Sequence, residues 1–151
     1  MIMNVKKTNE DAVIPVFAHK TDSGFDLFTC EELTIEGRKK AIAKTGLIFE
    51  IPNGWGIQIK NKSGITMKGV PTTSGQNADI TVYEGTIDMD YRGEVGIMIK
   101  NEEEQSITIP KHTKIAQGVL RKVYHCTFAE VKEVNETVRG EGGFGSTGNT
   151  L

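Results

Sequence analysis

A short stretch of this 151-residue sequence, Gly85 to Glu94 (GTIDMDYRGE), places two carboxylates two residues apart, at Asp88 and Asp90. On an extended chain these acids point to one face and Tyr91 to the other. A carboxylate within hydrogen-bond reach of a water molecule can act as its general base. The stretch therefore indicates a hydrolytic site or, on the simpler interpretation, an acidic turn at the surface.

The carboxyl-terminal stretch, residues 139–151 (RGEGGFGSTGNTL), combines groups that suit a nucleotide. An arginine offers a charged donor fork, two hydroxyls add donors, and glycines let backbone amides approach an anion. A phenylalanine among the glycines offers a flat face for a nucleobase. We expect residues 1–138 to form a β-domain and 139–151 a flexible lid of that domain, although the composition alone favours a solvated tail. The candidate binding residues are Arg139, Phe144, Gly145, Ser146 and Thr147.

A third candidate follows an alternating strand, where Lys62, Ser63 and Gly64 put a cation, a hydroxyl and a glycine in succession. Such a run can form a phosphate-binding nest. The sequence has no Gly-x-x-x-x-Gly-Lys-Ser/Thr run, so a phosphate-loop ATPase is not supported. The histidines lack metal-ligand spacing, and Cys30 and Cys126 are expected to be reduced and to pack as small apolar residues.

The composition predicts the kind of scaffold that positions these residues. Ile, Val and Thr together number 43, whereas Leu and Ala number 12, and there are 17 glycines. β-branched side chains fit pleated surfaces, and Leu and Ala favour helices, so a helical bundle is excluded. Period-2 alternation predicts an all-β sandwich, jelly roll or distorted barrel, with residues 70–79 as a polar loop. The expected strands include 41–51, 57–60, 94–100, 107–109 and 114–126.

The charge balance limits the classes of partner. The net charge is −2, with 37% hydrophobic and 25% charged residues. This near-balance argues against binding to bulk nucleic acid or to an anionic membrane, but leaves room for a small basic pocket. No apolar run approaches the roughly 20 residues of a membrane span, and residues 1–7 lack a signal-peptide core. We expect a soluble, cytoplasmic protein.

The candidate stretches also occur in a familiar order. With two weaker runs they make five: Ser23–Leu27 (SGFDL), Lys62–Gly64 (KSG), Gly85–Glu94, Lys114–Gln117 (KIAQ) and Arg139–Gly148. In this order and spacing the sequence resembles the homotrimeric dUTPases (dUTP diphosphatases). The resemblance implies a jelly-roll-like β-clip fold assembled as a homotrimer, in which each active site draws on all three subunits. It implies hydrolysis of dUTP to dUMP and pyrophosphate, with Mg²⁺ chelated by the phosphates.

The same resemblance implies roles for the residues that handle the phosphates. Asp88 would deprotonate the water that attacks the α-phosphorus. Asp26 would lie near the metal, through water or as structural support. The residues that would contact phosphates or the water are Lys62, Ser63, Gly64 and Gln117.

It further implies how the nucleoside is recognised. Tyr91 would pack under the deoxyribose and exclude a 2′-hydroxyl, and the backbone from Val82 to Gly85 would read the uracil edge. In the lid, Arg139, Ser146 and Thr147 would hold the γ-phosphate while Phe144, beside Gly145, would cap the uracil.

The sequence departs from the family pattern in three places. Lys62 stands where the family usually has Arg, Gly118 stands where it usually has a larger apolar residue, and residues 68–83 are longer than expected. Two alternatives remain: a related dCTP deaminase, and a nucleotide-gated regulatory binding protein, for which the 70–79 segment is the only support. In either case a single small-molecule nucleotide is the expected ligand.

Overall fold

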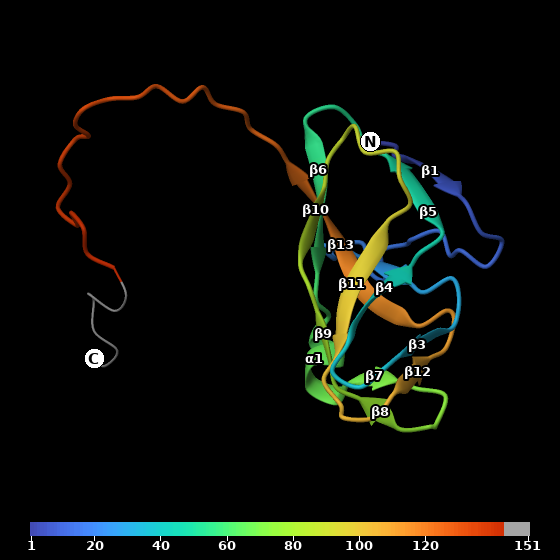
Figure 1. Cartoon of the computed structure of the whole chain (residues 1–151). Coiled ribbons are helices and arrows are strands. Elements are labelled where there is room, and N and C mark those ends of the chain that lie inside the picture. The colour runs from blue at the N-terminus through green and yellow to red at the C-terminus, as the bar shows by residue number, and fades with distance from the viewer. Residues whose placement is uncertain (144–151) are drawn as a thin grey trace.

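The structure, a computed structural model, describes residues 1–143, which form one short helix and a series of antiparallel strands (Figure 1). The predicted all-β, jelly-roll-like fold is confirmed. Within these residues no helix has the length and apolar character needed to cross a bilayer. The elements are β1 (Asn4–Lys7), β2 (Phe25–Phe28), β3 (Leu33–Ile35), β4 (Lys40–Lys44), β5 (Leu47–Glu50), β6 (Trp55–Lys60), α1 (Ser63–Lys68), β7 (Val70–Pro71), β8 (Asn77–Ala78), β9 (Ile80–Val82), β10 (Gly85–Ile87), β11 (Gly96–Asn101), β12 (Ile107–Ile109) and β13 (Lys114–Lys122).

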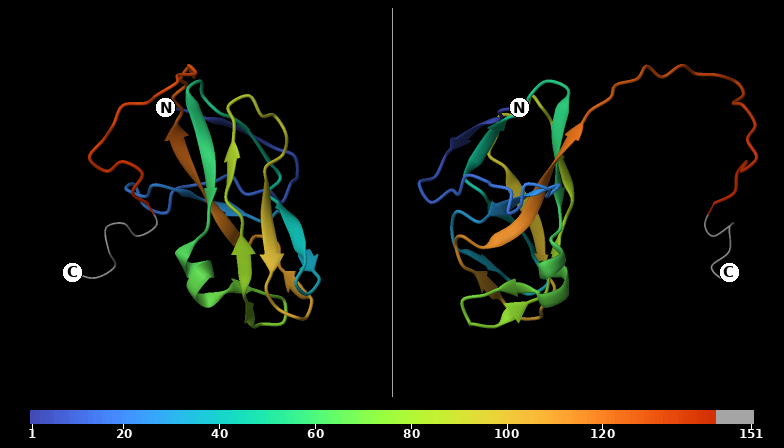
Figure 2. Two further views of the ribbon diagram at one scale, coloured as in Figure 1. Left: turned by 60° about the vertical axis from the view of Figure 1, so that its left-hand side comes forward. Right: turned by 180° about the vertical axis from the view of Figure 1, so that it is seen from behind.

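Two sheets carry most of the fold. One has the strand order β10-β6-β13-β2 and the other β4-β11-β9, and three two-stranded ribbons, β1-β5, β12-β3 and β7-β8, complete it. Figures 1 and 2 show α1 and the β7-β8 ribbon together at one end of the molecule, near β3 and β12. Because sequential strands change sheet, the segments that resemble family motifs are brought together from distant parts of the chain.

The core follows from the alternation seen in the sequence. In β6, Ile57 and Ile59 are buried, and in β11, Ile97 and Ile99 are buried, while the residues between them face outward or lie half-buried. These isoleucines belong to one cluster that unites both sheets. Burial of such side chains stabilises the fold by about 1.5–3 kcal/mol each. The opposite face of β6 is left for polar residues.

Three local expectations are wrong. Residues 41–51 do not form one strand, because Gly46 breaks them into β4 and β5 with a positive φ of 68°. The strand expected over 114–126 ends at Lys122. The polar loop expected over 70–79 is shorter than predicted: Val70–Pro71 and Asn77–Ala78 pair as the β7-β8 ribbon, and the residues between them form a turn closed by a hydrogen bond of 2.7 Å from Thr72 Oγ1 to the Gln76 carbonyl.

Gly118, one of the departures from the family pattern, has a steric explanation. It lies opposite Phe25 in the pairing of β13 with β2, and a Cβ at this position would come within 2.5 Å of the Phe25 ring. The Phe25 ring therefore occupies the space that a larger side chain at position 118 would need. The two residues compensate one another.

The chain leaves the sheets at the end of β13 as a long arm (Figures 1 and 2). Every residue from 121 to 141 is exposed, including the apolar Tyr124, Phe128, Val131 and Val134. The last strand ends at Lys122, before the domain boundary expected at residue 138. That boundary stays a prediction.

We expect Gly118→Ala to lower the free energy of unfolding by about 1–3 kcal/mol, because its methyl group overpacks against Phe25. Adding Phe25→Leu should recover part of this loss, so the double variant should lose less than the sum of the single variants. Urea unfolding at one fixed protein concentration measures these values. Gly143→Ala, in the exposed arm, is the matched control and should change stability by no more than about 0.5 kcal/mol. Strict additivity would contradict the steric explanation.

Candidate active site

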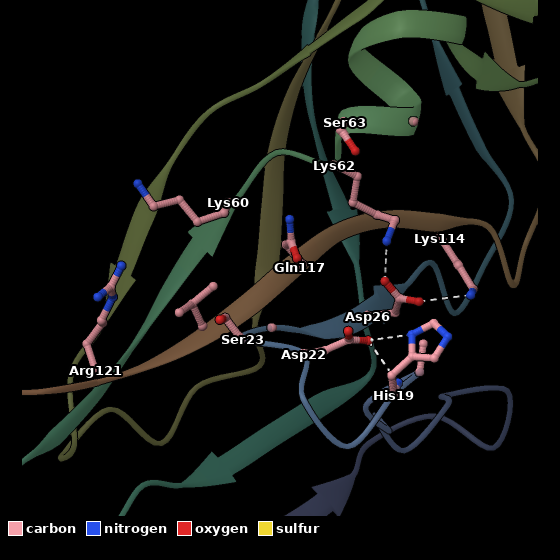
Figure 3. A pocket seen from close by; sticks show the side chains of 14 residues that line it. His19, Asp22, Ser23, Asp26, Lys60, Lys62, Ser63, Lys114, Gln117 and Arg121 are labelled. Carbon is pink, nitrogen blue, oxygen red and sulfur yellow. Dashed lines mark hydrogen bonds and ion pairs between the residues drawn. The ribbon is translucent and has the colours of Figure 1, made fainter.

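A hollow of about 520 Å³ lies over β2, β6 and β13 (Figure 3). Its lining is rich in cations and hydroxyls, and it collects residues from three of the five motif-like runs. Those with polar side chains are His19, Asp22, Ser23, Asp26, Lys60, Lys62, Ser63, Lys114, Gln117 and Arg121. Such a lining suits an anionic ligand.

Strand pairing brings the central residues of this hollow together. Gln117 of β13 lies opposite Asp26 of β2 on one side and opposite Lys60 of β6 on the other. Residues directly opposite one another in antiparallel strands point to the same face. Gln117 donates a 3.0 Å hydrogen bond to the Asn61 carbonyl, and a Cβ at Gly24 would lie 2.7 Å from its Oε1. Gly24 therefore leaves the room that the Gln117 amide occupies.

Asp26 is the electrostatic centre of the hollow. Its side chain is only 13% exposed, and its two oxygens have different partners: Lys62 donates to Oδ1, and Lys114 donates to Oδ2 at 2.8 Å. Burial by itself would raise the pKa of this carboxyl, but the hydrogen bonds and charges of Lys114 and Lys62 bring the pKa below its ordinary value of 3.8. Asp26 is therefore held as a carboxylate with a surplus of positive charge around it.

The predicted phosphate nest has a different local structure from the one expected. Ser63 and Gly64 are the first residues of α1, and Lys62 precedes them in an extended conformation, with its N–H bonded to Asn61 Oδ1 at 2.8 Å. Ser63 and Gly64 still line the hollow, and a Cβ at Gly64 would meet open space. This leaves the backbone of α1 accessible to a ligand at that point.

A second, smaller hollow of about 250 Å³ contains Gly85, Asp88 and Tyr91. The expectation that Asp88 and Asp90 share a face of an extended chain is wrong, because β10 ends at Ile87 and the Tyr91 N–H bonds to the Asp88 carbonyl at 3.2 Å, which closes a turn. Val82 lies in β9 with its side chain in the core, 6% exposed, so only its backbone is available to a ligand.

Tyr91 is held in this hollow by its neighbours. Its hydroxyl donates to the Glu94 carbonyl at 3.1 Å, and a Cβ at Gly93 would lie 2.2 Å from that hydroxyl oxygen. The Glu94 carboxylate accepts hydrogen bonds from Thr8 Oγ1 at 3.0 Å and from the Gly46 N–H at 3.1 Å. Glu94 thus ties the turn that carries Asp88 and Tyr91 to the amino-terminal segment.

The two hollows are separate in one chain. Among the described residues, none lines both hollows. On β6, for example, Lys60 lines the larger hollow and Ile59 lines the smaller one. Successive residues of a strand point to opposite faces of the sheet. The phosphate-type residues on β2, β6 and β13 thus line one hollow, whereas Asp88 and Tyr91 line the other together with residues of β10 and β11.

Of the predicted lid residues, the structure describes only Arg139, which lines neither hollow. Arg139 is in the exposed arm, where its Nε donates to the Gly142 carbonyl at 2.8 Å. The other predicted lid residues, Phe144, Gly145, Ser146 and Thr147, lie outside the described residues. Their roles stay predictions.

Sequence reasoning missed several residues of the larger hollow. Lys114 appeared only as the first letter of the KIAQ run, and Lys60, Arg121 and His19 were not identified as site residues. For Lys60 and Arg121 the period-2 alternation was a usable signal, because both share a face with Gln117. For Lys114 the same alternation predicts the wrong face. Lys114 is three residues from Gln117, and residues three apart on a regular strand point to opposite faces.

The described residues do not form a cluster of metal ligands. Within residues 1–143, no three His, Cys, Asp or Glu side chains gather closely enough to hold a metal ion. Mg²⁺ is commonly bound by one or two carboxylates together with substrate phosphates. Asp26, a carboxylate that lines the larger hollow, is a ligand of the kind that such a phosphate-bound Mg²⁺ uses.

Comparison with known proteins agrees with these features. The family model for dUTPase matches residues 10–148. The deoxyuridine 5′-triphosphate nucleotidohydrolase of Clostridioides difficile is 40% identical over 146 residues, covering 97% of each chain, and that of Nautilia profundicola is 39% identical over 150 residues, covering 98% of this chain and 99% of its own.

Solved structures give the same result. The dUTPase of Staphylococcus bacteriophage 80alpha, solved with dUpNHpp, is 28% identical with a TM-score of 0.86, covering 97% of this chain and 98% of that one. A mutant dUTPase from phage phi11 of S. aureus, in which a structural Mg(II) ion is coordinated, is 25% identical with a TM-score of 0.77, covering 88% and 98%.

The lowered pKa of Asp26 predicts a pH dependence of stability. A carboxyl whose pKa is lower in the folded than in the unfolded state adds stability above its unfolded value, and loses this contribution as the pH falls through the folded value. Relative to Asp26→Asn, the wild type should therefore be more stable by about 1–2 kcal/mol at pH 7. The difference should shrink below the ordinary pKa of 3.8. Urea unfolding of both proteins between pH 7 and pH 2 measures it, and a difference that stays constant would contradict the ion pairs.

Proposed function

We propose, from the premise that this chain belongs to the dUTPase family and is a dUTP diphosphatase, that a water activated by Asp88 attacks the α-phosphorus of dUTP. The products are dUMP and pyrophosphate. The observation that carries the proposal is the division of the motif residues into a cation-rich hollow and a separate hollow with Asp88 and Tyr91. These halves suit the triphosphate and the deoxyuridine of one substrate.

In this proposal the larger hollow binds the triphosphate. Lys62, Ser63 and the backbone at Gly64 contact phosphate oxygens, and Gln117 orients a phosphate or the attacking water. Positive charge around the phosphates stabilises the charge that develops in the transition state. Asp26 would help to hold Mg²⁺, and the ion would supply further neutralisation of phosphate charge.

The smaller hollow selects the nucleoside. Asp88 accepts a proton from the water, and the Tyr91 ring packs under the deoxyribose so that a 2′-hydroxyl does not fit. Backbone groups near Gly85 form hydrogen bonds with uracil, and cytosine would leave those buried groups unpaired, which carries a large penalty. Arg139 and the residues that follow it close over the nucleotide.

We further propose that the enzyme is a homotrimer with shared active sites. Within the described part of one chain, no residue lines both hollows. The exposed arm, with Tyr124, Phe128, Val131 and Val134, is apolar surface that a partner subunit would cover. Both features support a site assembled from several copies of the chain.

A second candidate, a nucleotide-gated regulatory protein, has one observation in its favour. The structurally similar phage 80alpha dUTPase belongs to phage dUTPases described as controlling transfer of virulence genes by a G protein-like mechanism. The present chain carries the residues that this proposal assigns to hydrolysis, so a regulatory role would accompany catalysis rather than replace it.

Replacing the general base tests the mechanism. We expect Asp88→Asn to reduce pyrophosphate release from dUTP by about 10²–10⁴-fold, because the water loses its proton acceptor while charge and shape change little. The assay supplies dUTP, dTTP, dCTP and UTP in turn with Mg²⁺ and measures pyrophosphate and ammonia. Asp90→Asn is the matched control and should retain activity. Full activity of Asp88→Asn would refute the proposal, and ammonia released from dCTP would favour the deaminase.

The role of Tyr91 predicts a change in sugar selectivity. Tyr91→Ala should raise the ratio of kcat/KM for UTP to that for dUTP by at least about tenfold, because the ring no longer blocks the 2′-hydroxyl. Steady-state kinetics with both nucleotides measures this ratio. Tyr83→Ala, on the neighbouring hairpin segment, is the control. If the wild type hydrolyses UTP as well as dUTP, Tyr91 does not select the sugar.

A further inference from the structure

Lys114 has no role in the proposed reaction, yet it is built into the larger hollow. It bonds to Asp26 Oδ2 at 2.8 Å, while Lys62 takes the other oxygen, Oδ1 (Figure 3). The two lysines therefore bind different oxygens of the same carboxylate.

A β-bulge places Lys114 on this face. In the pairing of β13 with β2, Gln117 lies opposite Asp26 and Lys114 lies opposite Phe28, with a register shift between Lys114 and Ala116. Without the extra residue, Ile115 would face Phe28, and Lys114 would point to the other side of the sheet. Ile115 and Ala116 are both fully buried, which breaks the alternation at this point. Bulges commonly re-aim a side chain beside an active site.

The phosphate role of Lys62 creates a need for a second cation. Asp26 is 13% exposed. If Lys62 were its only partner, the carboxylate would be left unpaired whenever Lys62 turned to the triphosphate. A largely buried charge without a partner is strongly unfavourable. Lys62 also has a single ammonium, which lacks the fork with which arginine can hold two anions at once.

Lys114 is suited to remain with Asp26 during that exchange. Its backbone begins β13 and is paired with Phe28 of β2, and its ammonium lies 5.8 Å from the centre of the Phe28 ring, which limits where the side chain can go. Lys62 instead lies outside regular secondary structure, directly before α1. The other nearby lysine, Lys60, is paired with Glu84 at 2.7 Å.

We propose that Lys114 is a positioning residue that holds the Asp26 carboxylate in place, so that Lys62 can leave Asp26 and bind the triphosphate. The inference rests on the proposed function, because it assumes that Lys62 binds phosphate. Without Lys114, Asp26 would retain Lys62, and the triphosphate would have to compete with Asp26 for its ammonium.

The test measures binding separately from turnover. Calorimetry gives the Kd of Mg²⁺-dUpNHpp for the wild type, Lys114→Met and Lys114→Arg, and the inhibition constant of deoxyuridine, which has no phosphate, is measured for each. Lys111→Met is the matched control, because Lys111 is also ion-paired, to Asp11, and is 54% exposed compared with 53% for Lys114. If Lys114→Met does not fold, Lys114→Gln takes its place.

We expect the Kd of dUpNHpp to rise about tenfold in Lys114→Met, as for the loss of one charge-assisted contact. The deoxyuridine constant should not change, Lys114→Arg should restore binding, and Lys111→Met should bind as the wild type does. Equal weakening of deoxyuridine, or an unchanged Kd in Lys114→Met, would overturn the inference while the wild type still binds the analogue. A wild type that does not bind it would overturn the proposed function as well.

Discussion

The pairing of β13 with β2 on one side and β6 on the other determines where the charged groups that these strands contribute to the larger hollow lie. Asp26, Gln117 and Lys60 come from three different strands, and they meet only because their registers align in one row. The register in turn depends on the buried isoleucines of β6, since a slip by one residue would exchange the core face for the polar face. The arrangement of charges is thus a consequence of core packing.

Several glycines among the described residues leave room for a larger neighbouring group, and three of them adjoin β13 or Tyr91. Gly24 leaves room for the Gln117 amide, Gly93 for the Tyr91 hydroxyl, and Gly118 for the Phe25 ring. None of these glycines has a positive φ, so their value lies in space rather than in conformational freedom. In each case a larger neighbour is fixed by the room that the glycine leaves. Interiors are close-packed, so such pairs must change together.

The sequence predicted the fold class and most strands because burial alternates with period 2 in β6, β11 and β12. It did not predict the break at Gly46, where a positive φ follows from tertiary contacts, nor the β7-β8 ribbon, which is closed by side-chain hydrogen bonds within a polar segment. The extended interpretation of GTIDMDYRGE is wrong at Asp88, where the Tyr91 N–H bonds back to the Asp88 carbonyl and the acidic surface turn that the sequence also allowed is formed.

The candidate site was also predicted only in part, and the prediction failed where a residue's direction depends on the partner strand. Motif-like runs identified Asp26, Lys62 and Gln117, which the structure brings into one hollow. Lys114 was missed because a bulge inverts its direction, and a bulge depends on the partner strand rather than on the local sequence. The sequence also did not show that Asp88 and the phosphate-type residues line different hollows, since that depends on how the strands are arranged in the sheets.

That separation has a consequence for selectivity under the proposed homotrimer. The cation-rich hollow alone would accept the phosphates of many nucleotides, because charge and hydroxyls do not distinguish bases or sugars. The hollow with Tyr91 and the backbone near Gly85 can distinguish them, but it carries no cation for a triphosphate in its lining. Hydrolysis then requires that both halves, from different copies, hold one substrate at once. Selectivity for dUTP is in that case a property of the interface between copies, and a chain that fails to assemble would be unable to hydrolyse any nucleotide.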